Sequence, residues 1–183
     1  MTALSMFELN ILDFFQTLQN PVCDAIASLL SVIAANGEVF ILLTLLMLLY
    51  KPTRRAGLVC TTALILDFLI LNVTIKPLVA RIRPYDLNPA VQLIVRAPHD
   101  FSFPSGHTGV SFAFAFALKY LGKKPHRAAV IFAVVMGLSR LYLYVHYPTD
   151  VLAGALVGAI CGLMSVFVWK KASKSDAKCG KIE

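Results

Sequence analysis

Five apolar segments, each bounded by polar residues, constrain the fold of this chain more than any other feature. One ends at Tyr50, and the others cover about residues 56–75, 106–121, 127–145 and 150–169. Each approaches the length of about 20 residues at which an α-helix crosses the hydrocarbon core of a bilayer. Because 58% of the residues are hydrophobic and only 15% are charged, we expect an all-α, polytopic membrane helix bundle with about five transmembrane helices.

The chain is expected to form a single domain, with interfacial or shallow helices at 1–35, a spanning bundle at 36–169 and a basic tail at 170–183. A break near Gly37 is expected because one helix over residues 22–50 would exceed about 40 Å, more than a bilayer requires. The first segment has the period of an amphipathic helix, which lies on the membrane surface, packs on the rest of the protein, or does both. Its apolar positions are Leu4, Phe7, Ile11, Phe14 and Leu18.

The positive charges predict a membrane topology and no nucleic-acid partner. The formal net charge is +7, but a nucleic-acid-binding protein would not carry long apolar segments between its basic clusters. Twelve of the 17 basic residues fall into three groups, one directly after Tyr50, one around residues 119–127 and one in the tail. Cytoplasmic loops are enriched in Lys and Arg, so we expect a cytoplasmic C-terminus and an external N-terminus. The opposite face, where the chemistry is expected, carries Lys76, Arg81, Arg83, Arg96 and Arg140.

A helix is expected to begin within the sequence Phe-Pro-Ser-Gly-His-Thr at residues 103–108. Ser105 has the residue type of an N-cap, and Gly106 and His107 would follow in the first turn. A helix N-terminus presents unpaired N–H groups and the positive end of the dipole, so it can bind an anion such as phosphate. On this segment alone, capping without a ligand is the more common explanation.

Two cations precede this helix. Lys76 and Arg83 are seven residues apart, so they share a helix face if the second span continues past the bilayer. Pro84 would then end that helix, and Pro77 would bend it near Lys76. Interfacial cations that contact lipid headgroups are an equally good explanation of the pair.

A third group of polar residues comprises Arg140, His146 and Asp150, at the turn into the last helix. A carboxylate that orients one imidazole nitrogen leaves the other ready for nucleophilic attack or proton transfer. Alternatively, Asp150 caps the last helix and His146 is an interfacial histidine without chemistry. The His-x3-Asp spacing also suits a metal site, but the converging cations would repel a divalent ion and attract a phosphoryl group. We therefore expect no metal and no cofactor.

The three groups together resemble the signature of the type 2 phosphatidic acid phosphatase (PAP2) family, which is related to vanadium-dependent haloperoxidases. All three parts match in order and spacing. They are Lys76-x6-Arg83-Pro84, Pro104-Ser105-Gly106-His107 and Ser139-Arg140-x5-His146-x3-Asp150. The resemblance implies a PAP2/haloperoxidase-like helical core and a membrane lipid phosphatase.

The resemblance also implies a role for each matching residue. His146 looks like the nucleophile that forms a phosphohistidine, and Asp150 is similar to the acid that orients and polarises it. His107 looks like the general acid that protonates the leaving oxygen and later activates water. The phosphate oxygens would be bound by Lys76, Arg83, Ser105, Gly106 and Arg140. Cations and a helix N-terminus can supply the required alignment and charge stabilisation without a metal.

The expected substrate is a phospholipid or polyprenyl phosphate in the bilayer, held at headgroup depth on the extracytoplasmic side of the cell membrane. The chain most resembles bacterial members of the family that act on undecaprenyl diphosphate, the first candidate, or on phosphatidylglycerol phosphate and phosphatidic acid. The polar residues Arg96, His99 and Asp100 lie in a loop that would shape the entrance, although an ordinary solvated loop is the more common explanation. The oligomeric state is not predicted.

Two further features of the spans concern helix packing. Asp67 lies midway along the second span, where a charge is costly, and we expect it to be protonated or hydrogen-bonded in a helix contact. Gly154, Gly158 and Gly162 recur every four residues and indicate a close helix contact inside one subunit. A small transporter or a catalytically silent scaffold is the rival function, but a transporter would spread its polar residues through the spans.

Overall fold

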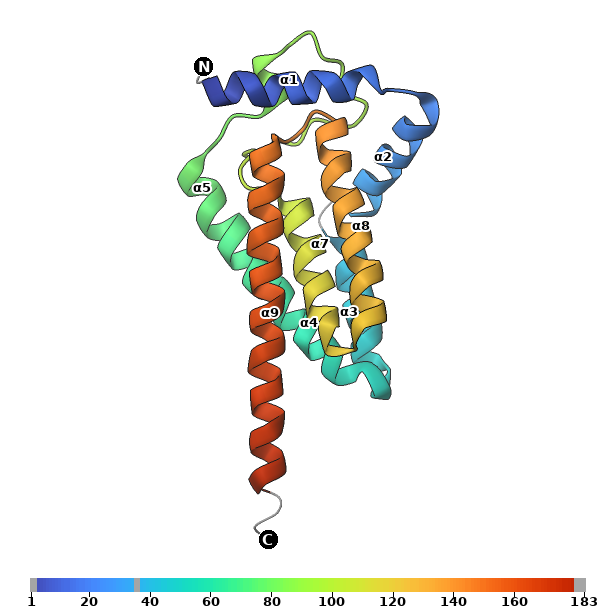
Figure 1. Cartoon of the computed structure of the whole chain (residues 1–183), viewed down its shortest axis with the longest axis vertical. Coiled ribbons are helices and arrows are strands. Elements are labelled where there is room, and N and C mark those ends of the chain that lie inside the picture. Colours follow the sequence, from blue (N-terminus) through green and yellow to red (C-terminus); the bar gives the residue numbers. More distant parts are fainter. Residues whose placement is uncertain (1–2, 35–36, 180–183) are drawn as a thin grey trace.

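The protein is a bundle of helices in the computed structural model, which describes residues 3–34 and 37–179. All regular elements of this described part are helical. The helices are α1 (Ala3–Thr17), α2 (Pro21–Ile33), α3 (Glu38–Leu49), α4 (Arg54–Asp67), α5 (Lys76–Val79), α6 (Pro84–Leu87), α7 (Gly106–Ala117), α8 (Lys123–Tyr142) and α9 (Pro148–Cys179). Figure 1 shows α3, α7, α8 and α9 side by side, with α1 lying across one end of the bundle.

The five predicted apolar segments correspond to α3, to α4 with its continuation into α5, and to α7, α8 and α9. By length and composition, two helical stretches can cross a membrane, Lys51–Leu87 and Pro148–Ser173, and a third is possible if the bent pair of α2 and α3 counts as one. The all-α membrane bundle is thus confirmed, whereas the number of five spans stays a prediction. Leucine, isoleucine and phenylalanine side chains are exposed along the outer faces of the helices, as a lipid environment favours.

The break expected near Gly37 separates α2 from α3, which are bent by 55° with respect to each other. Gly37 has a φ of 78° and is the N-cap of α3, a left-handed conformation that glycine adopts without strain. Asn20 begins α2, because its side-chain oxygen accepts hydrogen bonds from the backbone N–H groups of Val22 and Cys23. Asn36 and the end of the basic tail, including Lys181, lie outside the described residues.

Helix α1 packs on the bundle through a mixed face centred on Glu8 and Leu12 and turns its predicted apolar stripe outward. Leu4, Phe7 and Phe14 are 58%, 62% and 60% exposed, whereas Glu8 and Leu12 are buried. The contact with the rest of the protein is therefore confirmed, and it uses Leu9, Leu12 and Phe15 together with Glu8 instead of the predicted apolar stripe. An outward stripe suits a helix at the membrane surface, which stays a prediction.

Helix α7 lies at the centre of the bundle and packs closely against α9. A Cβ atom on Gly158 would lie 2.2 Å from the carbonyl oxygen of Gly109, and one on Gly154 would lie 2.5 Å from that of Ser105. Only glycine allows two helix backbones to approach in this way. The predicted glycine contact is thus confirmed within one chain, and it brings the N-termini of α7 and α9 together.

The predicted helix from Lys76 to Arg83 is wrong. A π-helical stretch, Phe68–Ile75, leads into α5, which ends at Val79, and Ala80 has a left-handed φ of 48°. Pro77 lacks the N–H that would continue α-helical hydrogen bonding, and the wider π turns lie directly before it. Pro84 begins the short helix α6 instead of ending a long one, because proline is favoured in the first turn of a helix.

The two ends of the bundle differ in the way that the charge pattern predicts. Figure 1 shows the α3–α4 turn, the α7–α8 turn and the last turns of α9 at the end of the bundle opposite α1. The α8–α9 loop, the segment after α5 and the N-terminus of α7 all lie at the α1 end. The residues of the predicted site therefore come together at one end, opposite most of the basic loops.

Candidate active site

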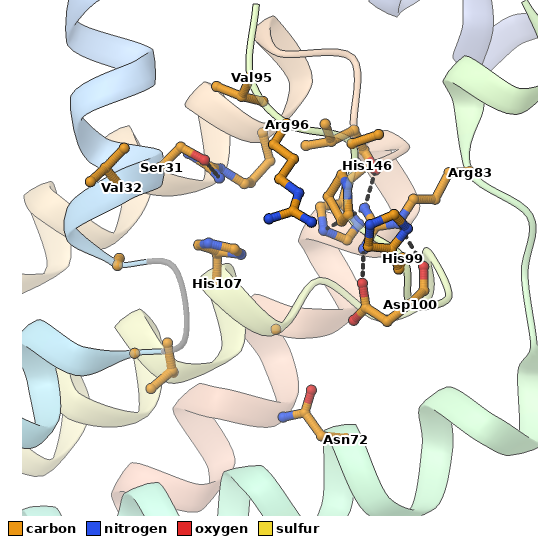
Figure 2. Close-up of a pocket in the computed structure, with 18 of the residues that line it drawn as sticks. Ser31, Val32, Asn72, Arg83, Val95, Arg96, His99, Asp100, His107 and His146 are labelled. Atoms are coloured by element: carbon orange, nitrogen blue, oxygen red, sulfur yellow. Dashed lines mark hydrogen bonds and ion pairs between the residues drawn. The ribbon is translucent and has the colours of Figure 1, made fainter. Parts of the chain in front are cut away.

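A cavity of about 1010 Å³ opens at this end of the bundle. Its walls come from α2, the π-helical stretch, the loop before α7, the first turn of α7 and the α8–α9 loop (Figure 2). Six of the eight predicted site residues line it, namely Lys76, Arg83, Gly106, His107, Arg140 and His146. The other two, Ser105 and Asp150, are fully buried and lie behind the cavity wall.

The imidazole of His146 is held with one nitrogen available to a ligand. Its Nδ1 lies 2.8 Å from the carbonyl oxygen of Ser102, and a carbonyl oxygen only accepts hydrogen bonds, so Nδ1 carries the proton. The unprotonated Nε2 lies 3.4 Å from Nη1 of Arg83. Burial lowers the pKa of His146 to about 4, although the nearby Asp150 carboxylate opposes this shift. His146 is therefore neutral at pH 7, as a nucleophile requires.

Asp150 lies near His146 but makes no direct hydrogen bond to its ring. The nearest Asp150 oxygen is 3.6 Å from Nδ1 of His146, beyond hydrogen-bonding range. The same carboxylate accepts hydrogen bonds from the hydroxyl of Ser102 at 2.5 Å and from the backbone N–H of Tyr147 at 2.9 Å. Asp150 thus orients the residue whose carbonyl holds the imidazole, a route through Ser102 that no sequence pattern indicated.

Arg81 is a second residue that the sequence analysis did not assign. Its guanidinium donates to Asp150 at 2.6 Å and to Glu8 of α1 at 2.5 Å, and it lies 3.7 Å above the ring of Tyr147. The available signal was only its place among the five basic residues on the predicted outer side. Its partners are 69 and 73 positions away in the chain, and no spacing rule connects them.

Lys76 and Arg83 converge on the carboxylate of Asp100, which belongs to the loop before α7. Arg83 donates to Asp100 Oδ1 at 2.6 Å, and Lys76 forms a short ion pair with Oδ2. Burial tends to raise the pKa of Asp100, but the hydrogen bonds and charges of Lys76 and Arg83 outweigh it and lower the pKa to about 2. A carboxylate with two cationic partners occupies the position that phosphate oxygens would take.

Arg140 and His107 lie in the cavity wall, and neither has all the hydrogen-bond or ion-pair partners that its side chain could bind. Arg140 is 1% exposed and donates to the hydroxyls of Ser139 and Ser31, but it has no carboxylate partner among the described residues. Nε2 of His107 is buried without a hydrogen-bond partner in the part of the chain that the structure describes. Buried polar groups are normally satisfied, so both groups can bind a polar ligand.

The N-terminus of α7 is anchored to α9. Ser105 is its N-cap, as predicted, but its hydroxyl accepts from Thr108 instead of capping a backbone N–H. Its own backbone N–H donates to the carbonyl oxygen of Asp150 at 3.0 Å. Gly106 lines the cavity beside Lys76, where a Cβ atom would lie 3.8 Å from the lysine Nζ.

Asp67 and three polar residues of the loop before α7 also line the cavity. Asp67 is buried, lines the cavity, and has one carboxylate oxygen without a hydrogen-bond partner among the described residues, so its expected protonation or hydrogen-bonding stays a prediction. Arg96, His99 and Asp100 all line the cavity, so their loop is more than a solvated connection. Figure 2 shows the Arg96 guanidinium pointing into the space between His107 and His146.

Metal binding is the remaining alternative for His146 and Asp150. Within residues 3–34 and 37–179, no group of three or more His, Cys, Asp or Glu side chains has the arrangement of a metal site. The expectation of a metal-independent reaction stays a prediction.

Comparisons with known proteins agree with this geometry. An undecaprenyl-diphosphatase of Sulfolobus acidocaldarius is 33% identical over 129 residues, which are 70% of this chain but only 62% of that protein. The crystal structure of Aquifex aeolicus LpxE has a TM-score of 0.76 at 27% identity and covers 86% of this chain and 93% of its own. That of a PAP2-type phosphatidylglycerolphosphate phosphatase from Bacillus subtilis has a TM-score of 0.70 at 26% identity, covering 96% and 88%.

The family model of the PAP2 superfamily matches residues 55–174, which is more than half of the chain and includes every residue of the three-part signature. The signature residues meet in one cavity, and the solved relatives share the arrangement of helices. The chain therefore belongs to the PAP2 superfamily of phosphatases.

Proposed function

We propose that this protein hydrolyses a lipid phosphate or lipid diphosphate through a phosphohistidine intermediate on His146, with undecaprenyl diphosphate as the first candidate substrate. The observation that carries the proposal is the unprotonated Nε2 of His146, which lies 3.4 Å from Nη1 of Arg83 in a cavity where Arg140 has no carboxylate partner in the described chain. A neutral nucleophile surrounded by cations is the arrangement that phosphoryl transfer requires.

The reaction proceeds in two balanced steps. Nε2 of His146 attacks the terminal phosphorus, a nitrogen–phosphorus bond forms, and the bond from phosphorus to the bridging oxygen breaks. His107 donates a proton to that leaving oxygen, so undecaprenyl phosphate departs. A water molecule then gives a proton to His107 as it attacks the phosphorus, the nitrogen–phosphorus bond breaks, and inorganic phosphate leaves.

The cations align the phosphoryl group during both steps. Lys76 and Arg83 exchange Asp100 for phosphate oxygens, while Arg140 and the N-terminus of α7 bind the remaining oxygens. These cations stabilise the negative charge of the phosphoryl group, as a metal ion does in other phosphoryl-transfer enzymes. The proposed reaction is therefore independent of a metal.

The charges that line the cavity favour a diphosphate over a monophosphate. Four cations, Lys76, Arg83, Arg96 and Arg140, face two carboxylates, Asp67 and Asp100. Arg96 makes no hydrogen bond or ion pair with any described residue, so its charge is available to a second phosphate. Phosphatidylglycerol phosphate and phosphatidic acid are the alternative substrates, and one structurally similar protein is a phosphatidylglycerolphosphate phosphatase.

The proposed location of the site is the extracytoplasmic face of the cell membrane, with a cytoplasmic C-terminus. The support is the distribution of charge, since most Lys and Arg residues lie at the end of the bundle opposite the cavity. A lipid phosphate would be held there with its chain in the bilayer. A transporter or a silent scaffold gives no reason for His107, His146 and Arg140 to meet in one cavity.

Replacing His146 with alanine is expected to abolish phosphate release from undecaprenyl diphosphate by the purified protein in detergent, because it removes the proposed nucleophile. His126→Ala is the matched control, since His126 hydrogen-bonds the backbone of Ala115 at the other end of the bundle. Wild-type activity should also survive a metal chelator. Full activity of the His146→Ala protein, or chelator inhibition that a divalent ion reverses, would contradict the mechanism.

Replacing Arg96 with glutamine is expected to lower the preference for diphosphates by about tenfold, because a hydrogen bond to a charged group is worth about 1.5–3 kcal/mol. The measurement is kcat/KM for a prenyl diphosphate and for a prenyl monophosphate of the same chain length. Arg127→Gln, at the opposite end, should leave the ratio unchanged. An equal loss on both substrates would exclude Arg96 as the ligand of the second phosphate.

A cysteine at position 92 is expected to react with a membrane-impermeant thiol reagent on intact cells, because Gln92 is exposed in the loop beside the cavity. Cys23 is also exposed and is replaced by serine in this experiment. Cys179, in the predicted cytoplasmic tail, should react only after lysis. Protection of position 92 until lysis would place the site in the cytoplasm.

A further inference from the structure

We propose that Glu8 of α1 is a positioning residue for the His146 reaction and acts on it through Arg81 and Asp150. The inference rests on the proposed function, and it extends the site beyond residues 55–174 that match the family model. Glu8 is 1% exposed although it belongs to an N-terminal helix, and a carboxylate is rarely buried without partners.

Glu8 first fixes the start of α9. Its Oε1 accepts a hydrogen bond from the backbone N–H of Thr149 at 3.0 Å and another from the Thr149 hydroxyl at 2.5 Å. The N–H groups at a helix N-terminus have no partner within the helix, and a negative charge there is favourable. Glu8 therefore caps α9 from a different helix, at the residue next to Asp150.

Glu8 also forms one end of a chain of charges. The two terminal nitrogens of Arg81 divide between Glu8 at 2.5 Å and Asp150 at 2.6 Å. The carboxylates are 2% and 0% exposed as side chains, whereas Arg81 is 22% exposed. Water screens such buried interactions weakly, so the charge of Glu8 affects Asp150 through their shared arginine.

The negative charge of Glu8 is expected to stabilise the phosphohistidine intermediate. Attack by Nε2 on phosphorus leaves a positive charge on the His146 ring, because Nδ1 keeps its proton. Glu8, Arg81 and Asp150 together carry one net negative charge, which stabilises that cation. Without the charge of Glu8, Arg81 would neutralise Asp150 alone and the stabilisation of the cationic ring would fall.

A purely mechanical role for Glu8 can be separated from this one, because other residues also fasten α1. Asp13 accepts a hydrogen bond from the Tyr144 hydroxyl at 2.8 Å, and Gln16 donates to the backbone of Tyr142 at 3.0 Å. Neither residue contacts Arg81 or Asp150 in the structure. Asp13→Asn is therefore a matched control that weakens the attachment of α1 without changing the charge chain.

The test compares Glu8→Gln with Asp13→Asn, using phosphate release from undecaprenyl diphosphate by purified protein in detergent. Glu8→Gln should lower kcat by about tenfold or more, with KM changing less than about twofold, whereas Asp13→Asn should stay within about twofold of wild type in both. Glu8→Asp, which keeps the charge, should recover part of the lost kcat. Thermal unfolding of each protein shows whether the fold is intact.

A double-mutant cycle tests the route of the effect. Because Glu8 acts through Arg81, adding Glu8→Gln to an Arg81→Gln protein should change kcat by less than about threefold, far less than in wild type. Equal losses in the two backgrounds would contradict the route. A Glu8→Gln protein that behaves like Asp13→Asn, or a Glu8→Asp protein as impaired as Glu8→Gln, would overturn the inference.

Orthovanadate separates this inference from the proposed function, because it resembles the phosphoryl-transfer transition state and needs no lipid. Its binding, measured by calorimetry, should weaken about fivefold or more in Glu8→Gln and remain unchanged in Asp13→Asn. If vanadate binding depends on Glu8 while no tested lipid is hydrolysed, the substrate proposal fails and the inference stands. If lipid is hydrolysed and neither measurement depends on Glu8, the inference alone fails.

Discussion

The close contact between α7 and α9 is the constraint on which the rest of the site depends. The glycines of α9 allow the two backbones to approach until the N–H of Ser105 donates to the carbonyl of Asp150. This bond joins the helix that carries His107 to the helix that carries Asp150. A larger residue at Gly154 or Gly158 would push the helices apart, and the two motifs would no longer face one cavity.

Electrostatics then decide what the cavity accepts. Arg140 is buried without a carboxylate partner in the described chain, and Lys76 and Arg83 share Asp100, whose pKa is lowered to about 2 by these cations against the opposing effect of burial. Bringing positive charge out of water is costly unless an anion compensates for it. A phosphate group supplies that compensation, so the charges of the cavity suit an anion.

Much of this arrangement follows from the sequence, and the failures have physical reasons. Apolar segments place the helices well, because the membrane requires a nearly continuous run for each one. Motif spacing predicts that His146 and Asp150 lie near each other, and they are 3.6 Å apart across the turn into α9, although their roles stay a prediction. The helix predicted from Lys76 to Arg83 fails because Ala80 adopts a left-handed conformation, which no residue type there indicates.

The contacts of Arg81 and Ser102 with distant segments were not predictable from the sequence. Arg81 finds Glu8 across 73 positions and Asp150 across 69, and Ser102 reaches His146 across 44. Sequence periodicity describes which side of a helix is polar, but it does not say what that side contacts. The period of α1 therefore did not show that Glu8 and Leu12 face the bundle, and the role of Glu8 at the start of α9 emerged only from the fold.

The central claim is that His146 becomes covalently phosphorylated, and trapping the intermediate tests it most directly. Purified protein is mixed with undecaprenyl diphosphate, quenched in alkali within one turnover, digested and analysed by mass spectrometry. We expect an acid-labile phosphoryl group on the peptide that contains His146. A phosphoryl group on another residue, or active enzyme that turns over without any phosphorylated His146 peptide, would contradict it.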